Sequence, residues 1–419
     1  MNRQPDKGGR TEEALREYFL KAGYYAVRGI PFVYEGSDVT DVDIWLYIRP
    51  SPVGRERISV DAKDRGKPKA LERVLWAKGL QAILGLERCI VATTDRRPLV
   101  RKFGHEHGVL VLDGDVLSRL IASKIADSSD RISEEEFVSQ IDAPPHVDRL
   151  LGQWRRKMLD AKSRLLSALD FDGCNAWLED FEYFAHETLT SGRRGVSCRL
   201  SYLIMSFLLV GIDYSMRTLA FEPAEVRRQA IQDGFRYGSG GREKVEHALK
   251  LATSLIDTYA PDAAALVSRM RTQLANDAAL LRVDMLAEHF TRAEVSRELF
   301  NYARMFEAHA FARVFVPPHG LEPALQGILG VALDFLAIDR NTFFKAVDIA
   351  TAHRSRGRFE SRGRFEGDSS SGQSDPSQPD PGQPDSASNQ LELSGQFTSD
   401  ENPSDSKAAG DRGPGRGSD

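Results

Sequence analysis

Three charged side chains in the first 63 residues, Asp43, Asp61 and Lys63, are spaced so that they could form a catalytic metal site. Asp43 stands between Val42 and Ile44 in an apolar stretch that is typical of a buried strand. Asp61 and Lys63 lie two residues apart in the next such stretch, and the period-two geometry of a strand puts both side chains on one face of the sheet. If the two strands pair, the two aspartates approach each other.

Two carboxylates at one point repel each other unless a cation lies between them, and oxygen ligands suit Mg²⁺ or Mn²⁺. A lysine beside such a cation can hold a water or hydroxide and stabilise charge that develops on a phosphate. Glu12 or Glu13 could assist from the preceding helix, although the helix macrodipole alone also favours carboxylates in a first turn. For Asp61 and Lys63 the alternative is an exposed ion pair on an edge strand. Asp43 is harder to explain without a functional site, because burying an unpaired carboxylate costs several kcal/mol of folding free energy.

The elements that must position these residues alternate between helix and strand over residues 1–126. Thr11 is the predicted N-cap of the first helix. The predicted order is a helix over 11–22, strands over 24–34, 42–48 and 57–63, a helix over 69–84, a strand over 89–93, a helix over 98–107, a strand over 109–112 and a helix over 115–124. This pattern predicts an α/β domain with a sheet covered by helices.

This order resembles the PD-(D/E)xK nuclease superfamily, in particular its Mrr-like, restriction-endonuclease-like members, over about residues 10–125. As in that family, a helix with a glutamate is followed by an aspartate on one strand and by D/E-x-K on the next, here Glu12, Asp43 and Asp61-Ala62-Lys63. Residues 23–27, Gly-Tyr-Tyr-Ala-Val, are similar to the segment after the family's first helix, and residues 108–117 are similar to the closing strand and helix of Mrr-like domains. The family's first motif often reads Pro-Asp. Here residues 40–43 read Thr-Asp-Val-Asp, which leaves Asp41 as an alternative to Asp43.

The resemblance implies a restriction-endonuclease-like mixed sheet flanked by helices and a site for Mg²⁺ (or Mn²⁺). Asp43, Asp61 and Glu12 would bind the metal, and Lys63 would position the attacking water. The implied activity is endonucleolytic hydrolysis of phosphodiester bonds, in DNA rather than RNA, which could serve restriction or defence against foreign DNA. The tripeptide alone carries little weight, because residues 160–162 repeat Asp-Ala-Lys inside a helical stripe.

Basic residues follow the motif and suit contact with phosphates. Glycine and proline make residues 64–68 a loop at the mouth of the expected site, and the predicted nucleic-acid contacts are Arg65, Lys67, Lys69 and Lys78. Residues 1–125 hold 22 Lys and Arg against 17 Asp and Glu, whereas the whole chain carries a net charge of −5. A basic first domain can approach a polyanion, although charge runs are commonly solvated surface.

The remaining chain is predicted to contain a linker over 127–145, an all-α domain over 146–353 and a disordered tail over 354–419. Helical stripes run over 147–169, 175–190, 197–213, 222–236, 243–260, 262–281, 284–314 and 320–350. No chemical motif marks this half. It could confer target choice, binding of a protein partner, homo-oligomerisation or sensing of an activating signal.

The sequence also favours a cytoplasmic protein without a membrane partner. The start shows no apolar signal segment, and the longest apolar run, 203–212, is shorter than the ~20 residues of a membrane span. Three cysteines without C-x-x-C spacing exclude a disulfide framework and a cysteine zinc site. The alternative function is a catalytically silent subunit with a nuclease fold that binds nucleic acid or joins an assembly, which predicts binding without turnover.

Overall fold

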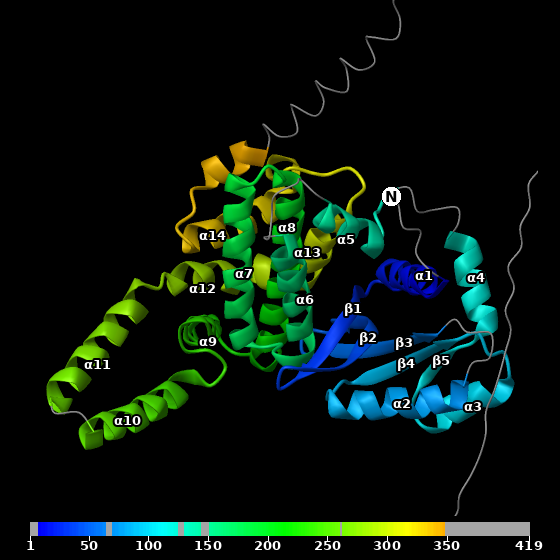
Figure 1. The fold of residues 1–419 in the computed structure, drawn as a ribbon, viewed down its shortest axis with the longest axis horizontal. Coiled ribbons are helices and arrows are strands. Elements are labelled where there is room, and N and C mark those ends of the chain that lie inside the picture. The colour runs from blue at the N-terminus through cyan, green and yellow to red at the C-terminus, as the bar shows by residue number, and fades with distance from the viewer. Residues whose placement is uncertain (1–6, 64–68, 125–129, 144–150, 260–261, 348–419) are drawn as a thin grey trace, which may run out of the picture. The chain divides into compact units, whose positions relative to one another are not determined.

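The first part of the chain forms a sheet flanked by helices (Figure 1). The computed structural model describes residues 7–63, 69–124, 130–143, 151–259 and 262–347. Its first nine elements are α1 (Lys7–Lys21), β1 (Tyr25–Tyr34), β2 (Ser37–Ile48), β3 (Glu56–Lys63), α2 (Ala70–Ile83), β4 (Arg88–Thr93), α3 (Pro98–Glu106), β5 (Leu110–Leu112) and α4 (Gly114–Lys124). This order confirms the alternation of helices and strands predicted for this part of the chain.

The five strands form one mixed sheet in the order β1-β2-β3-β4-β5. β1 pairs antiparallel with β2, and β2 pairs antiparallel with β3, with Ile44 opposite Val60. β3 and β4 run parallel, as do β4 and β5. The parallel pairs require crossover connections, which the helices α2 and α3 supply.

Each face of the sheet buries a different set of side chains. Leu15 and Phe19 of α1 and Leu117 of α4 pack on Ile44 and Val60 on one face. On the other face, apolar residues of α2 and α3 pack on β4 and β5, namely Val74, Ala77, Val91, Val100 and Val111. Because side chains alternate along a strand, residues next to Ile44 and Val60 in the sequence point to this second face.

The second part of the chain is helical, as predicted. Its helices are α5 (Glu134–Asp142), α6 (Leu151–Ser167), α7 (Phe171–Thr190), α8 (Arg194–Ser215), η1 (Met216–Leu219), α9 (Ala224–Tyr237), α10 (Gly241–Tyr259), α11 (Ala263–Leu280), α12 (Val283–Thr291), α13 (Ala293–Phe311), η2 (Pro318–Gly320) and α14 (Pro323–Phe335). Figure 1 shows α7, α8 and α13 side by side, with α10 and α11 extending from them as a hairpin. α10 and α11 contain no buried residue.

α8 is the central helix, with every residue from Ser197 to Tyr214 buried. Among the described residues, the segment Arg194–Leu219 is the one helix that is long and apolar enough to cross a membrane. Of its most apolar window, 89% is buried inside the protein, as expected for the core helix of a folded body.

The helical part and the sheet share one hydrophobic core. Tyr25, Trp45 and Tyr47, from β1 and β2, belong to the same buried cluster as the residues of α6, α7 and α8. The Tyr25 hydroxyl lies 2.7 Å from the Ser206 hydroxyl of α8. The described residues accordingly belong to a single compact unit. The sequence suggested two bodies joined by a linker, but large aromatic side chains on β1 and β2 join them.

Local predictions were wrong at three places. Thr11 does not cap the first helix, because α1 begins at Lys7 and the threonine is buried in its second turn. The expected linker contains α5, which begins with a capping box formed by Ser133 and Glu136 and buries Phe137 and Ile141. The stripe over 284–314 is split into α12 and α13 around Arg292, whose backbone is not helical. The predicted tail over 354–419 lies outside the described residues.

Candidate functional site

The pairing of β2 with β3 brings Asp43 and Asp61 together. Ile44 and Val60 are opposite each other in the antiparallel ladder, Asp43 comes directly before Ile44 and Asp61 directly after Val60. The two aspartates are therefore neighbours at the next position of the ladder, and their side chains lie on the same face of the sheet. The backbone N–H of Ala62 donates a hydrogen bond of 2.8 Å to Oδ2 of Asp43. Both carboxylates are half-buried. This is the juxtaposition that the sequence predicted from strand alternation.

The alternative residue Asp41 lies two residues before Asp43 on β2 and is exposed. It pairs with Pro31 of β1, whereas Asp43 contacts the backbone of β3. The geometry therefore favours Asp43 over Asp41 as the partner of Asp61.

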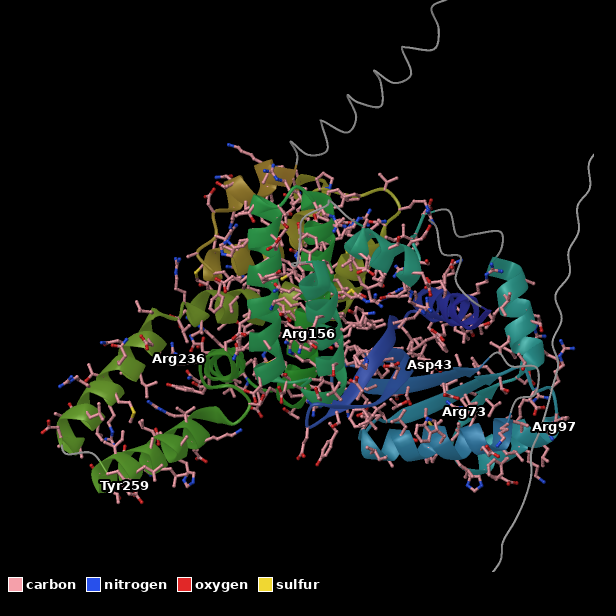
Figure 2. All side chains as sticks on the ribbon, in the orientation of Figure 1. Asp43, Arg73, Arg97, Arg156, Arg236 and Tyr259 are labelled. Atoms are coloured by element: carbon pink, nitrogen blue, oxygen red, sulfur yellow. The ribbon has the colours of Figure 1, made fainter. Side chains whose placement is uncertain are left out.

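Arg73, in the first turns of α2, holds the carboxylate of Asp61. Its Nε lies 2.7 Å from Oδ2 of Asp61, and its Nη2 contacts Oδ1, so the pair is bidentate. Burial lowers the pKa of Arg73, and the nearby charge of Asp43 acts in the opposite direction. The guanidinium thus lies within electrostatic reach of both aspartates. Figure 2 shows Asp43 on β2 and Arg73 on α2.

This role of Arg73 was not recognised in the sequence, where the arginine was only one of several basic residues after the motif. A usable signal existed in its position, since Arg73 falls in the first turns of α2, the helix that comes next after β3 in the chain. That placement returns a long side chain toward the end of the strand.

The structure describes the side chains of some of the other predicted site residues but not of all of them. Lys63 is the last residue of β3, opposite Thr93 of β4, and its side chain lies outside the description, as do Arg65 and Lys67. Lys69 is exposed and pairs with Glu72 at 3.0 Å. The remaining candidate, Lys78, donates a hydrogen bond of 2.9 Å to Oε1 of Gln81. Gln81 also contacts Cys89 near the start of β4, away from the end of β3 that carries Lys63.

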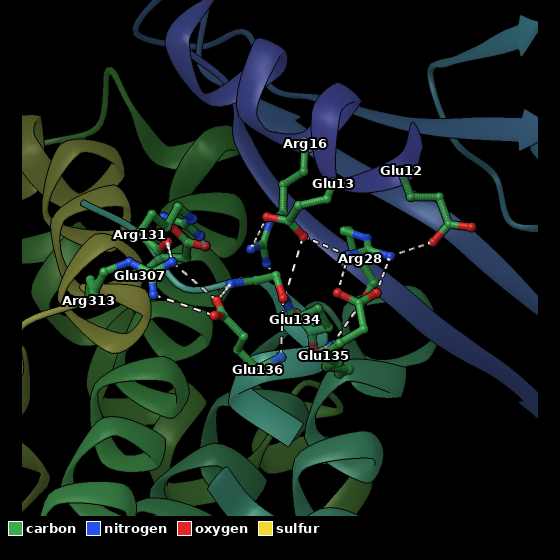
Figure 3. A network of polar contacts seen from close by, with 12 residues as sticks. Glu12, Glu13, Arg16, Arg28, Arg131, Glu134, Glu135, Glu136, Glu307 and Arg313 are labelled. Atoms are coloured by element: carbon green, nitrogen blue, oxygen red, sulfur yellow. Dashed lines mark hydrogen bonds and ion pairs between the residues drawn. The ribbon is translucent and has the colours of Figure 1, made fainter. Parts of the chain in front are cut away.

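Glu12 and Glu13 belong to a network of ion pairs on the α1 side of the sheet (Figure 3). Glu12 Oε2 lies 2.9 Å from Nη2 of Arg28, and Glu13 Oε2 lies 2.6 Å from its Nη1. Arg28 also contacts Glu135 of α5 at 3.0 Å. Burial alone would lower the pKa of Arg28, but Glu13 and Glu135 outweigh it and raise the pKa. This network connects α1, β1 and α5, so the two glutamates have a structural role in the fold.

The two aspartates suit Mg²⁺ better than a metal ion whose ligands must all come from the protein. Among the residues that the structure describes, no group of three His, Cys, Asp or Glu side chains is placed to hold a metal ion. Mg²⁺ is usually bound by one or two carboxylates together with waters and substrate phosphates. Asp43 and Asp61 meet that requirement, provided that the ion shares Asp61 with Arg73 or displaces it.

Comparisons with known proteins add no relative: no family model, curated protein or solved structure matches this chain.

Proposed function

We propose that the chain is a metal-dependent phosphodiesterase that acts on DNA. The observation that carries the proposal is the neighbouring position of Asp43 and Asp61 on one face of two paired strands, with Lys63 two residues further along β3. The sheet topology, with an antiparallel β1-β2-β3 meander followed by two parallel strands, is compatible with the nuclease family that the sequence resembles.

In this proposal Asp43 and Asp61 hold the Mg²⁺, and Lys63 orients the water. The ion, when bound, lowers the pKa of a water and neutralises charge on the scissile phosphate. The chain's own groups set the position: the N–H of Ala62 fixes the rotamer of Asp43, and Arg73 holds Asp61 from the side of α2. Glu12 would have to leave Arg28 to act as a third ligand, so the proposal depends on the two aspartates.

Plasmid cleavage with and without Mg²⁺ tests the proposal. We expect cleavage by the unmodified protein and a loss of at least about 100-fold in Asp61→Asn and Lys63→Ala, because general acid–base and metal contributions are of this size. Asp160→Asn is the matched control, since Asp160 belongs to the second Asp-Ala-Lys and is exposed on α6. Cleavage that survives in both site variants would refute the assignment.

One observation favours the second candidate function, a silent nuclease fold that binds nucleic acid. The bidentate pair with Arg73 already satisfies the charge of Asp61. A silent subunit would bind DNA without cleaving it, and Asp43→Asn would bind DNA as the unmodified protein does. Mg²⁺ titration distinguishes the two functions, because only the enzyme is expected to bind the ion in a manner that Asp43→Asn abolishes.

A further inference from the structure

A pocket of about 270 Å³ lies between the β2–β3 hairpin and the helical part of the chain. It lies beside the end of β2 and the C-terminal end of α8, and it is also lined by α9 and by the first turns of α13. Four arginines and one aspartate provide its charged groups, and the rest of its lining is Pro52, Met216, Ala220, Ser296 and Leu299. The arginines are Arg49, Arg55, Arg227 and Arg297.

Asp213 neutralises only part of this positive charge. Its buried carboxylate accepts hydrogen bonds from Arg55 Nε at 2.5 Å and Nη2 at 2.8 Å, and from Arg49 Nη1 at 3.0 Å. The hydroxyl of Tyr47 donates a further bond of 2.6 Å. One carboxylate thus serves two guanidinium groups, which leaves an excess positive charge at the floor of the pocket.

The other two arginines increase that excess. Within the described chain, the guanidinium groups of Arg227 and Arg297 make no ion pair and no hydrogen bond to a protein acceptor. Nε of Arg227 is buried without a hydrogen-bond partner. A buried donor of this kind costs free energy until an acceptor reaches it, and an arginine cluster without counter-charge attracts anions.

We propose that this pocket binds the phosphoryl group of a small phosphorylated ligand. Four guanidinium groups opposed by one carboxylate suit a dianion better than a single carboxylate ligand, and the planar fork of arginine matches phosphate oxygens. The volume is at the lower limit of small-molecule sites, so it admits a phosphoryl group with a small organic portion. Met216, Ala220 and Leu299 offer apolar surface for that portion.

The proposal is independent of the phosphodiesterase function, because none of the lining residues belongs to the site around Asp43 and Asp61. It gives the helical part a specific role, since α8, α9 and α13 supply three of the five charged groups. Met216, Ala220 and Leu299 of the helical part also supply three of the four apolar lining residues. Arg49 directly follows β2, the strand that carries Asp43.

Isothermal titration of the full chain with inorganic phosphate, pyrophosphate and AMP, at constant ionic strength in NaCl, tests the proposal. We expect saturable binding of at least one of the three probes. Binding should be weakened roughly tenfold or more in Arg227→Gln and in Arg297→Gln, because each substitution removes charge-assisted hydrogen bonds to the phosphoryl oxygens. Arg228→Gln is the matched control, because Arg228 neighbours Arg227 on α9 but does not line the pocket.

Unchanged urea midpoints without ligand, together with selective loss of binding in the two pocket variants, support the proposal. Absence of binding to all three probes, or equal weakening in Arg228→Gln, overturns it. A second titration uses a duplex oligonucleotide in place of the small probes. If Arg227→Gln weakens binding of the duplex while none of the three small probes binds, the pocket binds a phosphate of nucleic acid, and the small-ligand proposal is wrong.

Discussion

Replacing Asp213 by asparagine should test how the sheet is fixed to the helical part. Asp213 lies on α8, and its side chain is 1% exposed. Its carboxylate receives bonds from Tyr47, Arg49 and Arg55, which all lie on β2 or in the β2–β3 hairpin. Asparagine has nearly the same shape, so the substitution removes the charge and one acceptor oxygen while the volume is kept.

The expected loss of stability follows from these contacts. The carboxylate accepts four bonds, and the single oxygen of asparagine can accept about half of them, so two charge-assisted bonds are lost at ~1.5–3 kcal/mol each. The loss also leaves the buried guanidinium group of Arg55 and the half-buried one of Arg49 without counter-charge. Breaking a buried ion pair by removing one partner costs about 3–5 kcal/mol, which agrees with the sum over bonds.

Urea unfolding followed by far-ultraviolet circular dichroism is the assay. We expect the free energy of unfolding to fall by about 3–5 kcal/mol in Asp213→Asn. The exposed Asp277→Asn on α11 should change it by less than about 0.5 kcal/mol. In the double variant with Arg49→Met, the loss should be smaller than the sum of the single losses by about 1–3 kcal/mol, because the two groups contact each other. A loss below about 1 kcal/mol, or additive effects, would refute the reasoning.

Three further outcomes are expected. Glu13→Gln should lower the free energy of unfolding by about 1.5–3 kcal/mol, because it removes the charge that Arg16 and Arg28 share, although Arg16 keeps Glu134 and Arg28 keeps Glu12 and Glu135. Urea unfolding measures the change, and a neutral effect would contradict the structural role. Arg73→Gln should strengthen Mg²⁺ binding about fivefold, because it releases the carboxylate of Asp61 for the ion, and isothermal titration calorimetry measures the change. Weaker binding in this variant would show that Arg73 supports the site instead. Burial lowers the pKa of His289 from 6.5 to about 4, so the unfolded chain takes up the proton first as the pH falls. The contribution of His289 to stability should therefore be complete above pH 6.5 and be lost between pH 6.5 and 4, so the free energy of unfolding should fall less steeply over this range in His289→Gln. An unchanged slope in that variant would contradict this assignment.

Local sequence patterns were sufficient to predict the order of helices and strands in the first part and the face of the sheet on which the candidate residues lie. Both depend on local periodicity, because alternation along β3 fixes the side of Asp61 whatever packs on it. These patterns also predicted that most of the second part is helical. Each of these features is set by residues that are close in the chain, so the pattern of apolar and polar positions was sufficient.

The charged groups that contact each other could not be predicted without the folded structure. Arg73 of α2 holds Asp61 of β3, and Glu12 contacts Arg28 of β1. Asp213 lies more than 150 residues from the arginines it neutralises. Such pairs depend on how helices dock on the sheet, and no local periodicity reports that. The same reason explains the shared core: Trp45 and Tyr47 alternate like the inward residues of any strand, and only docking showed that α8 covers them.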